Sequence, residues 1–386
     1  MLAADTADRS PQARGWLNQR ARGVAAAGRR ARHVLMTADA VGGVWRYALD
    51  LAAALARRQV RTTLAVMGPA PSSAQRREAE RASLAIVHQP CRLEWMDDPW
   101  TDVEQAGRWL LRLERTLQPD IVHLNGYAHA ALPWYAPTVV VGHSCVRSWW
   151  RAVKGAPAPG RFDPYRRAVQ LGLAAAHLVV APTAAMLRSL KGEYALGTWS
   201  RVIPNGTPAA HREPQWTAKK PVVLAAGRVW DEAKNIDAVC RVAGAWPWPV
   251  CVAGDQQSPD GDHAALSAVR PLGRLDCQQM ADWHRRASIY VSPARYEPFG
   301  LSILEAAAAG CALVLGDIAS LRENWADAAL FVPVDDHAAL SRAVGDLISN
   351  DERRRRMARR AWRRAARFTI DRTAEHYVRA YEDVGA

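Results

Sequence analysis

The sequence has little that would support a disulfide framework or a zinc site. Its six cysteines are scattered along 386 residues, and no two of them form a C-x-x-C pair. Several stand inside apolar runs, as Cys251 does in PVCVAG and Cys311 does in CALVLG. Cysteines in such runs are typical of small core residues. We therefore expect reduced, buried cysteines and a cytoplasmic protein.

Long hydrophobic runs are also missing. No apolar stretch reaches the roughly 20 residues that a membrane-spanning helix needs. Residues 1–32 are rich in alanine and arginine and contain no hydrophobic segment of the kind found in secretory signals. We expect these residues to form a basic arm outside the fold. The predicted location is cytoplasmic, either free or peripherally bound at the inner face of the membrane.

Short apolar runs alternate with helix-like segments twice along the chain. The first series occupies residues 33–206, and the second occupies 221–366 after a polar, proline-bearing linker at 207–220. Residues 367–386 continue in a helical pattern. Such alternation is typical of parallel sheets with helices on both faces. The sequence thus predicts an α/β protein of two Rossmann-like, doubly wound domains.

Two such sheets that face each other leave a cleft between the carboxyl ends of their strands, where ligands of this architecture bind. A nicotinamide cofactor is the first candidate. However, no G-x-G-x-x-G fingerprint follows a strand in this chain, and the DAVGG turn at residues 39–43 is a poor substitute. The missing fingerprint argues against a dinucleotide enzyme.

The net charge of +13 raises the question of an anionic partner. Arginine greatly outnumbers lysine and alanine is abundant throughout, so we attribute most of the charge to compositional bias. The arginine-rich stretch 353–367 is interpreted either as a helix that contacts an anionic membrane or as a solvated helix, and its few apolar positions favour the solvated helix. No recognised nucleic-acid motif is present, and we expect no nucleic-acid partner.

Two cations follow the first strand of the second domain. Arg228 comes just after PVVLAAG, and Lys234 lies six residues later near the start of the next helix. Cations held on rigid elements suit a diphosphate, whose oxygens match the fork of an arginine. Taken alone, the pair would be interpreted as solvated loop charges.

The stretch RYEPFGLSILEAAAAG at 295–310 places one carboxylate before an apolar helix and another within it. Gly300 stands at the predicted helix entry, where the backbone N–H groups of Phe299, Gly300 and Leu301 can bind an anion or a hydroxyl. Glu297 is expected on the cleft surface, and Glu305 one turn deeper on the face of Leu301. Each can accept hydrogen bonds from sugar or ribose hydroxyls. The plainer alternatives are an exposed loop charge for Glu297 and an ion pair or a capping role for Glu305.

These segments carry a resemblance to a known family. PDIVHLN, GRVWDEAKN, YVSPARYEPFGLSILEAAAAG and the DAVGG loop resemble glycosyltransferase family 4 over roughly residues 33–384, and EPFGLSILEA is a highly specific match. Glu297 and Glu305 match the Glu-x7-Glu motif of that family. The resemblance implies the GT-B fold, in which the C-terminal helices return toward the first domain.

The resemblance also implies roles for the second-domain residues. Arg228 and Lys234 match the pair that holds the donor diphosphate, and Glu297 matches the glutamate beside the donor sugar. Glu305 matches the ribose-binding glutamate. The other donor-binding positions that it implies are the backbone groups of Phe299, Gly300 and Leu301 and, at the nucleotide base, those of Arg274 and Leu275.

Further matches fall in the first domain. Gly42 and Gly43 match the glycine loop over the donor phosphates, and His143 in VVVGHS matches a histidine that contacts the transferred sugar. Asn205 and Gly206 match the NG pair at which the chain leaves the first domain. Trp149 and Trp150 follow His143 and are predicted either to stack on an acceptor sugar or to pack in a surface loop.

The implied reaction is a retaining transfer from a UDP-sugar or GDP-sugar to a saccharide or lipid-linked saccharide. It is implied to need no metal and no cofactor, because fixed cations and a helix N-terminus can stabilise the leaving diphosphate. The D-x-D triplet Asp260–Asp262 is predicted to be a plain turn. Two alternatives stay open: a catalytically silent partner that binds nucleotide-sugars, and a GT-B epimerase.

Overall fold

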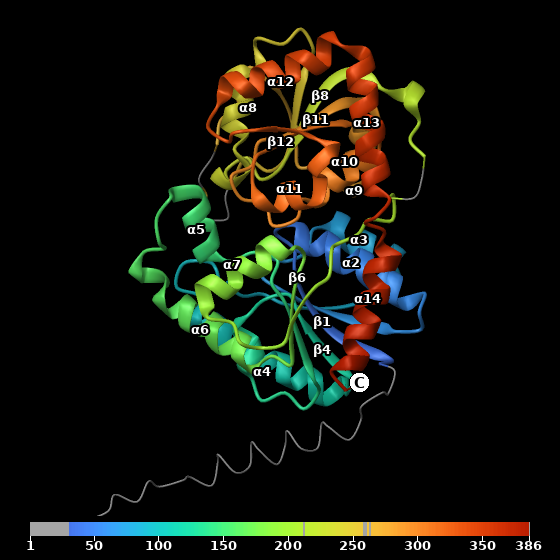
Figure 1. Cartoon of the computed structure of the whole chain (residues 1–386). Helices are drawn as coiled ribbons and strands as arrows, with labels where there is room; N and C mark the ends of the chain where they lie inside the picture. The colour runs from blue at the N-terminus through green and yellow to red at the C-terminus, as the bar shows by residue number, and fades with distance from the viewer. Residues whose placement is uncertain (1–30, 211–212, 258–260, 262–263, 386) are drawn as a thin grey trace, which may run out of the picture.

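The computed structural model describes residues 31–210, 213–257, 261 and 264–385. They form two lobes, each built on a parallel sheet with helices on both faces (Figure 1). The predicted basic arm 1–32 falls almost entirely outside the described residues, as do Asp260 and Asp262. In the described part of the chain, no helix combines the length and apolar character needed to cross a bilayer.

The first sheet has seven parallel strands in the order β3-β2-β1-β4-β5-β6-β7. Its strands are β1 His33–Asp39, β2 Arg61–Met67, β3 Ala85–Gln89, β4 Ile121–Leu124, β5 Thr138–Val141, β6 Leu178–Ala181 and β7 Ser200–Val202. The helices of this lobe are α2 Gly43–Ala56, α3 Ser73–Arg81, α4 Trp100–Leu117, α5 Val146–Lys154, α6 Asp163–Ala175 and α7 Ala184–Tyr194. Because helices cover both faces, the central strands are buried on both sides, as β4 and β6 are.

The second sheet has six parallel strands in the order β10-β9-β8-β11-β12-β13. Its strands are β8 Lys220–Ala226, β9 Val250–Ala253, β10 Arg270–Gly273, β11 Ala287–Ser292, β12 Ala312–Gly316 and β13 Leu330–Val332. The helices are α8 Ile236–Ala243, α9 Cys277–Arg286, α10 Leu301–Ala308, α11 Ala319–Trp325, α12 His337–Ser349 and α13 Asp351–Ala365. Lys220, the last residue of the predicted linker, already belongs to β8.

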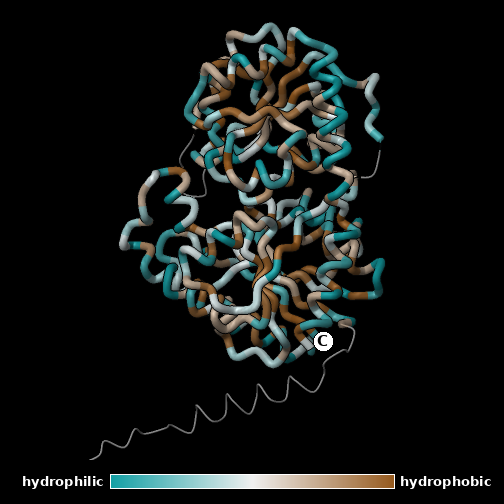
Figure 2. The backbone as a smooth tube through the Cα atoms, in the orientation of Figure 1, coloured by the Kyte–Doolittle hydropathy of each residue, from teal (hydrophilic) through white to brown (hydrophobic). Residues whose placement is uncertain are grey.

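Hydrophobic segments run through the middle of both lobes (Figure 2). Separate buried clusters fill the two faces of each sheet. The cysteines Cys145, Cys240, Cys251 and Cys311 are buried in these cores, as predicted, and Cys91 and Cys277 are partly buried.

The final helix, α14 Ile370–Asp383, crosses from the second lobe to the first, where it lies beside α2 (Figure 1). Its buried side chains Ile370, Tyr377 and Tyr381 belong to the first core, and Asp371 forms an ion pair with Arg57 at 2.8 Å. The predicted return of the C-terminal helices to the first domain is therefore confirmed.

The chain crosses between the lobes twice, and the two crossings touch. Thr207 on the outward path pairs with Thr369 on the return path through a β-bridge. A methyl group added at Gly206 would lie only 2.5 Å from the backbone of Thr369. This contact explains why a residue without a side chain stands at the end of the first domain.

Gly206→Ala is therefore expected to destabilise the protein by about 2 kcal/mol or more, because the methyl group must displace backbone rather than a flexible side chain. Urea unfolding followed by fluorescence measures this change. Gly345→Ala is a matched control, because Gly345 lies within α12 and nothing stands within 4 Å of the added methyl group. Equal midpoints for the two variants would contradict the role of the crossing.

Candidate active site

The loops at the carboxyl ends of the two sheets meet between the lobes. Arg274, which follows β10, donates to the carbonyl of Ala40 at 3.3 Å, and Thr183 Oγ1 donates to the carbonyl of Pro298 at 2.9 Å. Both contacts join one lobe to the other. The predicted cleft residues are thus brought together at this boundary.

Arg228 follows β8 and lies against Asp231, with 2.6 Å between Nη2 and Oδ2. Burial raises the pKa of the Asp231 carboxyl, but the charges of Arg228 and Lys234 outweigh burial and hold the pKa below its usual value. Arg228 Nε is buried and has no hydrogen-bond partner among the described residues. A fixed guanidinium with an unused donor fits an oxygen of a phosphate.

Lys234 and Glu297 touch directly. The ammonium of Lys234 lies 2.7 Å from Glu297 Oε2, and the two side chains are 21% and 17% exposed. Lys234 ends a short 3-10 turn, and the next residue, Asn235, adopts a left-handed conformation at φ 53°. The Asn235 amide donates to the carbonyls of Pro293 and Val334, which anchors the turn to the second sheet. The structure therefore joins a cation and a carboxylate that lie 63 residues apart in the sequence.

The helix α10 starts at Leu301 with Gly300 as its N-cap residue, at φ 87°. A methyl group on Gly300 would stand 2.7 Å from Ile303 Cδ1, so both the conformation and the packing favour glycine. No side chain caps this helix. Its first backbone N–H groups therefore have no capping side chain, and their binding of a ligand anion or hydroxyl stays a prediction.

Glu305 lies one turn into α10 and faces the other lobe. Arg46 of α2 approaches it, with 3.8 Å between Nε and Glu305 Oε1, while the same guanidinium lies 2.8 Å from Asp50. Burial raises the pKa of Glu305 to about 7, and the nearby Arg46 opposes that rise. Glu305 therefore changes charge close to neutral pH.

The glycines of the DAVGG loop approach the second lobe closely. A methyl group on Gly42 would lie 3.2 Å from Arg228 Nη1, and one on Gly43 would lie 3.9 Å from Leu301 Cδ1. Asp39 holds the loop by accepting hydrogen bonds from the backbone N–H groups of Val41 and Gly42. The glycine loop thus lies against the two elements that were predicted to hold the donor.

His143 is on the first lobe, after β5. Its Nε2 lies 2.8 Å from Asn125 Oδ1, and its ring packs edge-on against Tyr47 with 4.5 Å between centroids. Burial lowers the pKa of His143 to about 4. The imidazole is therefore neutral at physiological pH and can hydrogen-bond without carrying charge.

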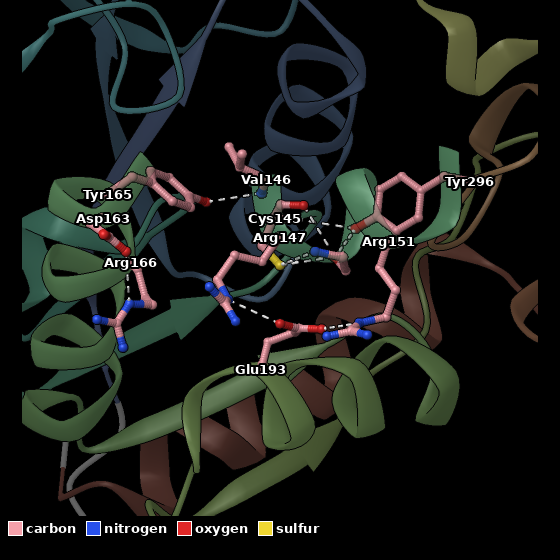
Figure 3. A network of polar contacts seen from close by, with 10 residues as sticks. Cys145, Val146, Arg147, Arg151, Asp163, Tyr165, Arg166, Glu193 and Tyr296 are labelled. Atoms are coloured by element: carbon pink, nitrogen blue, oxygen red, sulfur yellow. Dashed lines mark hydrogen bonds and ion pairs between the residues drawn. The ribbon is translucent and has the colours of Figure 1, made fainter. Parts of the chain in front are cut away.

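The helix α5 of the first lobe contacts the second lobe beside this site. Trp149 Nε1 donates to Asp231 Oδ1 at 3.1 Å, so it contacts the carboxylate that orients Arg228. Trp150 packs on Phe162 instead, with 6.1 Å between ring centroids. The hydroxyl of Tyr296 lies at the start of α5, 3.1 Å from the N–H of Cys145, as Figure 3 shows.

A cavity opens at the carboxyl ends of β1, β2 and β4 on the first lobe, next to Asn125. Polar and aromatic side chains that line it include Thr37, Asp39, Arg92, Glu94, Trp95 and His129. No group of three or more His, Cys, Asp or Glu side chains is placed to hold a metal ion in the parts of the chain that are described.

Comparison with known proteins identifies the chain. The model of Glycosyltransferase Family 4 matches residues 41–211, and the model of group 1 glycosyl transferases matches residues 220–350. The chain belongs to glycosyltransferase family 4. It is thus a glycosyltransferase, with the nucleotide-sugar donor that this family uses.

Sequence similarity between this family 4 enzyme and its relatives extends over most of the chain. A D-inositol 3-phosphate glycosyltransferase of Xylanimonas cellulosilytica is 29% identical, covering 89% of this chain and 92% of the relative. A glycogen synthase of Mycobacterium tuberculosis is 28% identical, covering 84% of this chain and 86% of the relative.

Solved structures show the same fold. Sucrose-phosphate synthase of Thermosynechococcus elongatus superposes with a TM-score of 0.74 at 18% identity, over 91% of this chain and 98% of that one. HepE of Anabaena, solved with UDP and glucose, superposes with a TM-score of 0.69 at 15% identity, over 90% of this chain and 99% of that one. The predicted GT-B fold is confirmed.

Three residues of the candidate site were not predicted from the sequence. Asp231 stands inside GRVWDEAKN, but only its burial at 5% exposure distinguishes it from its exposed neighbour Glu232. Arg46 looks like any polar position of an amphipathic helix. Asn125 ends PDIVHLN, one of the segments that resemble the family. Its hydrogen bond to His143 forms only because the strands β4 and β5 are neighbours in the sheet.

Proposed function

We propose that this enzyme transfers a sugar from a UDP-sugar or GDP-sugar to a saccharide or lipid-linked saccharide with retention of the anomeric configuration. The observation that carries the proposal is the convergence of Arg228, Lys234, Glu297 and the uncapped start of α10 on one side of the lobe boundary. These groups suit a sugar diphosphate in both charge and hydrogen bonding.

The leaving nucleoside diphosphate gains negative charge as the sugar departs. The guanidinium of Arg228 and the ammonium of Lys234 are held before the reaction, so they stabilise that charge without having to reorganise. The diphosphate competes with Glu297 for Lys234. Glu297 is then available to the sugar, where its charge favours the cationic character of the anomeric carbon.

The remaining residues that bind the nucleotide-sugar are assigned roles from their positions in the site. Glu305, deeper on α10, accepts from the ribose hydroxyls, and the backbone beside Arg274 and Leu275 contacts the base. Neutral His143 contacts the transferred sugar. We infer that the acceptor enters by the cavity on the first lobe, because Asn125, which lines it, is hydrogen-bonded to His143. The acceptor role of Trp149 and Trp150 stays a prediction, and Trp149 also joins the lobes.

The predicted contact of α13 with an anionic membrane has less support than the sugar transfer. The helix α13 buries Met357, Ala358 and Ala361 against the second core, which leaves no apolar face for a bilayer. Arg355 and Arg356 form ion pairs with acids of the same helix. We infer a cytoplasmic enzyme with a solvated α13; flotation with anionic vesicles at low and physiological salt tests this inference.

The reaction itself is tested by incubating the protein with a panel of UDP-, GDP- and ADP-sugars and candidate acceptors. The expected result is a glycosylated product whose anomeric proton coupling in NMR matches the configuration of the donor. An inverted anomer would contradict retention. A new sugar-nucleotide without acceptor would identify an epimerase, and binding with no turnover would identify a silent partner.

Transfer is expected to persist in EDTA, because Arg228 and Lys234 supply the positive charge that a divalent ion supplies elsewhere. The measurement is the initial rate before and after chelation and dialysis. Loss of activity that Mg²⁺ or Mn²⁺ restores would contradict this mechanism. It would also direct attention to Asp260 and Asp262.

A further inference from the structure

A continuous set of hydrogen bonds joins the last helix of the chain to His143. Tyr381 Oη of α14 lies 2.8 Å from His123 Nδ1. His123 Nε2 lies 3.3 Å from Asn125 Oδ1, and the same oxygen lies 2.8 Å from His143 Nε2. Tyr381 and His123 are fully buried. Groups enclosed in this way cannot exchange partners with water, so their hydrogens must be mutually compatible.

Asn125 sets the direction of these hydrogen bonds. Its Nδ2 donates to the backbone carbonyl of Thr37 at 2.6 Å, and a carbonyl can only accept. Oδ1 is therefore the atom that faces both histidines, and it too can only accept. Consequently His143 must carry a hydrogen on Nε2 and donate it to Asn125.

The arrangement of His123 follows from the same oxygen. If His123 Nε2 were unprotonated, its lone pair would face the lone pairs of Asn125 Oδ1. With the hydrogen on Nε2, His123 donates to Asn125, and its Nδ1 accepts from the hydroxyl of Tyr381. The hydroxyl of Tyr47, 3.4 Å from His123 Nε2, is then a second, weaker acceptor. Every hydrogen in the set has one consistent place.

We propose that Tyr381, His123 and Asn125 are positioning residues that fix His143 in its Nε2–H tautomer, so that Nδ1 presents a lone pair to a hydroxyl of the substrate. Among the described residues, no hydrogen-bond partner reaches His143 Nδ1. Burial also lowers the pKa values of His123 to about 3 and of His143 to about 4, so each ring carries a single hydrogen. The part that concerns the substrate rests on the proposed function; the tautomer does not.

The set also gives α14 a part in the candidate site, because it links Tyr381 to His143 through His123 and Asn125. Removing the Tyr381 hydroxyl leaves His123 Nδ1 without a donor, which makes the Nδ1–H form of His123 less costly. In that form the lone pair of His123 Nε2 faces Asn125 Oδ1, and this repulsion favours a turned amide that presents Nδ2 to both rings, at the cost of the Nδ2 hydrogen bond to the Thr37 carbonyl. His143 Nε2 would then accept, and its hydrogen would move to Nδ1.

The test is the tautomer of His143 in the full chain, measured by long-range ¹⁵N–¹H NMR on protein labelled at histidine. His143→Gln assigns the signal by its loss. The expected spectrum of the unliganded enzyme shows a protonated Nε2 and an unprotonated Nδ1, and Tyr381→Phe is expected to increase the share of the Nδ1–H form. Tyr377→Phe is the control on the same helix, because Tyr377 is equally buried and its ring also packs on His123, with 5.1 Å between centroids, while its hydroxyl is not hydrogen-bonded to His123.

Kinetics provides the second measurement. Tyr381→Phe is expected to lower kcat by about tenfold, as the loss of one buried hydrogen bond would, while calorimetry shows unchanged affinity for the nucleoside diphosphate. A protonated Nδ1 in the wild-type enzyme, or a tautomer that is the same in Tyr381→Phe, would overturn the proposal. If no nucleotide-sugar supports transfer, the proposed function fails, but the spectrum still decides the tautomer.

Discussion

Arg228→Ala is expected to lower kcat by about 100-fold or more, and Lys234→Ala by a similar factor, because each removes a fixed cation from the leaving diphosphate. Arg228 lies in the loop after β8 and Lys234 ends a short 3-10 turn, both at the carboxyl ends of the strands and outside the sheet itself, so the fold should survive. Steady-state rates with the identified donor, combined with circular dichroism, measure the two effects separately.

The interactions of each cation shape the expected outcome. Arg228→Ala leaves Asp231 buried with Trp149 and backbone partners only, so some loss of stability should accompany the loss of rate. Lys234→Ala leaves Glu297 without its ion pair. Arg241→Ala is the matched control, since Arg241 is 60% exposed on α8 and pairs with Asp237. Rates like those of this control in either variant, with nucleotide affinity intact, would contradict the assignment.

Substitutions of the two glutamates of the Glu-x7-Glu motif are expected to change different kinetic and binding constants. Glu297→Gln should lower kcat more than it raises KM, because it loses an interaction that strengthens as charge develops at the anomeric carbon. Glu305→Gln should instead weaken the donor and the free nucleoside diphosphate alike. The deciding measurement is the calorimetric affinity of both variants for the nucleoside diphosphate.

The pH dependence sharpens this comparison. A ribose diol donates two hydrogen bonds, which the ionised carboxylate accepts best, and the pKa of Glu305 lies at about 7. Nucleotide affinity should therefore rise as the pH increases through 7, and the rise should disappear in Glu305→Gln. If Glu297→Gln weakens the free nucleotide and Glu305→Gln does not, the two roles are reversed.

The sequence was sufficient to predict the local parts of the fold and of the site. Strands β8 and β11 are short apolar runs, and the residues that follow them, Arg228 and Glu297, stand at predictable loop positions. Gly300 stands directly before an apolar run, and this position predicts the start of α10. The motif around Glu297 and Glu305 is specific enough to indicate the family, and the family implies where α14 returns.

Contacts across the lobe boundary could not be predicted. Arg46 and Glu305 lie in different domains, and each alone fits a polar position on a helix; only the docking of α2 against α10 makes them neighbours. The sequence likewise contains no sign that Trp149 is hydrogen-bonded to Asp231, because that contact forms only where the two lobes meet. Trp149 was therefore interpreted as a residue that could stack on an acceptor sugar. The periodicity of a sequence reports which face of an element is buried, not which distant element covers it.

The return of α14 to the first lobe bears on how the protein folds during synthesis. The core of that lobe includes Ile370, Tyr377 and Tyr381, which are synthesised after the whole of the second lobe. Until then α2 and the buried His123 lack the helix that covers them. The N-terminal lobe, although translated first, therefore cannot complete its core until the second lobe has emerged. Contacts of such long sequence separation slow folding and leave an apolar surface open to chaperones in the meantime.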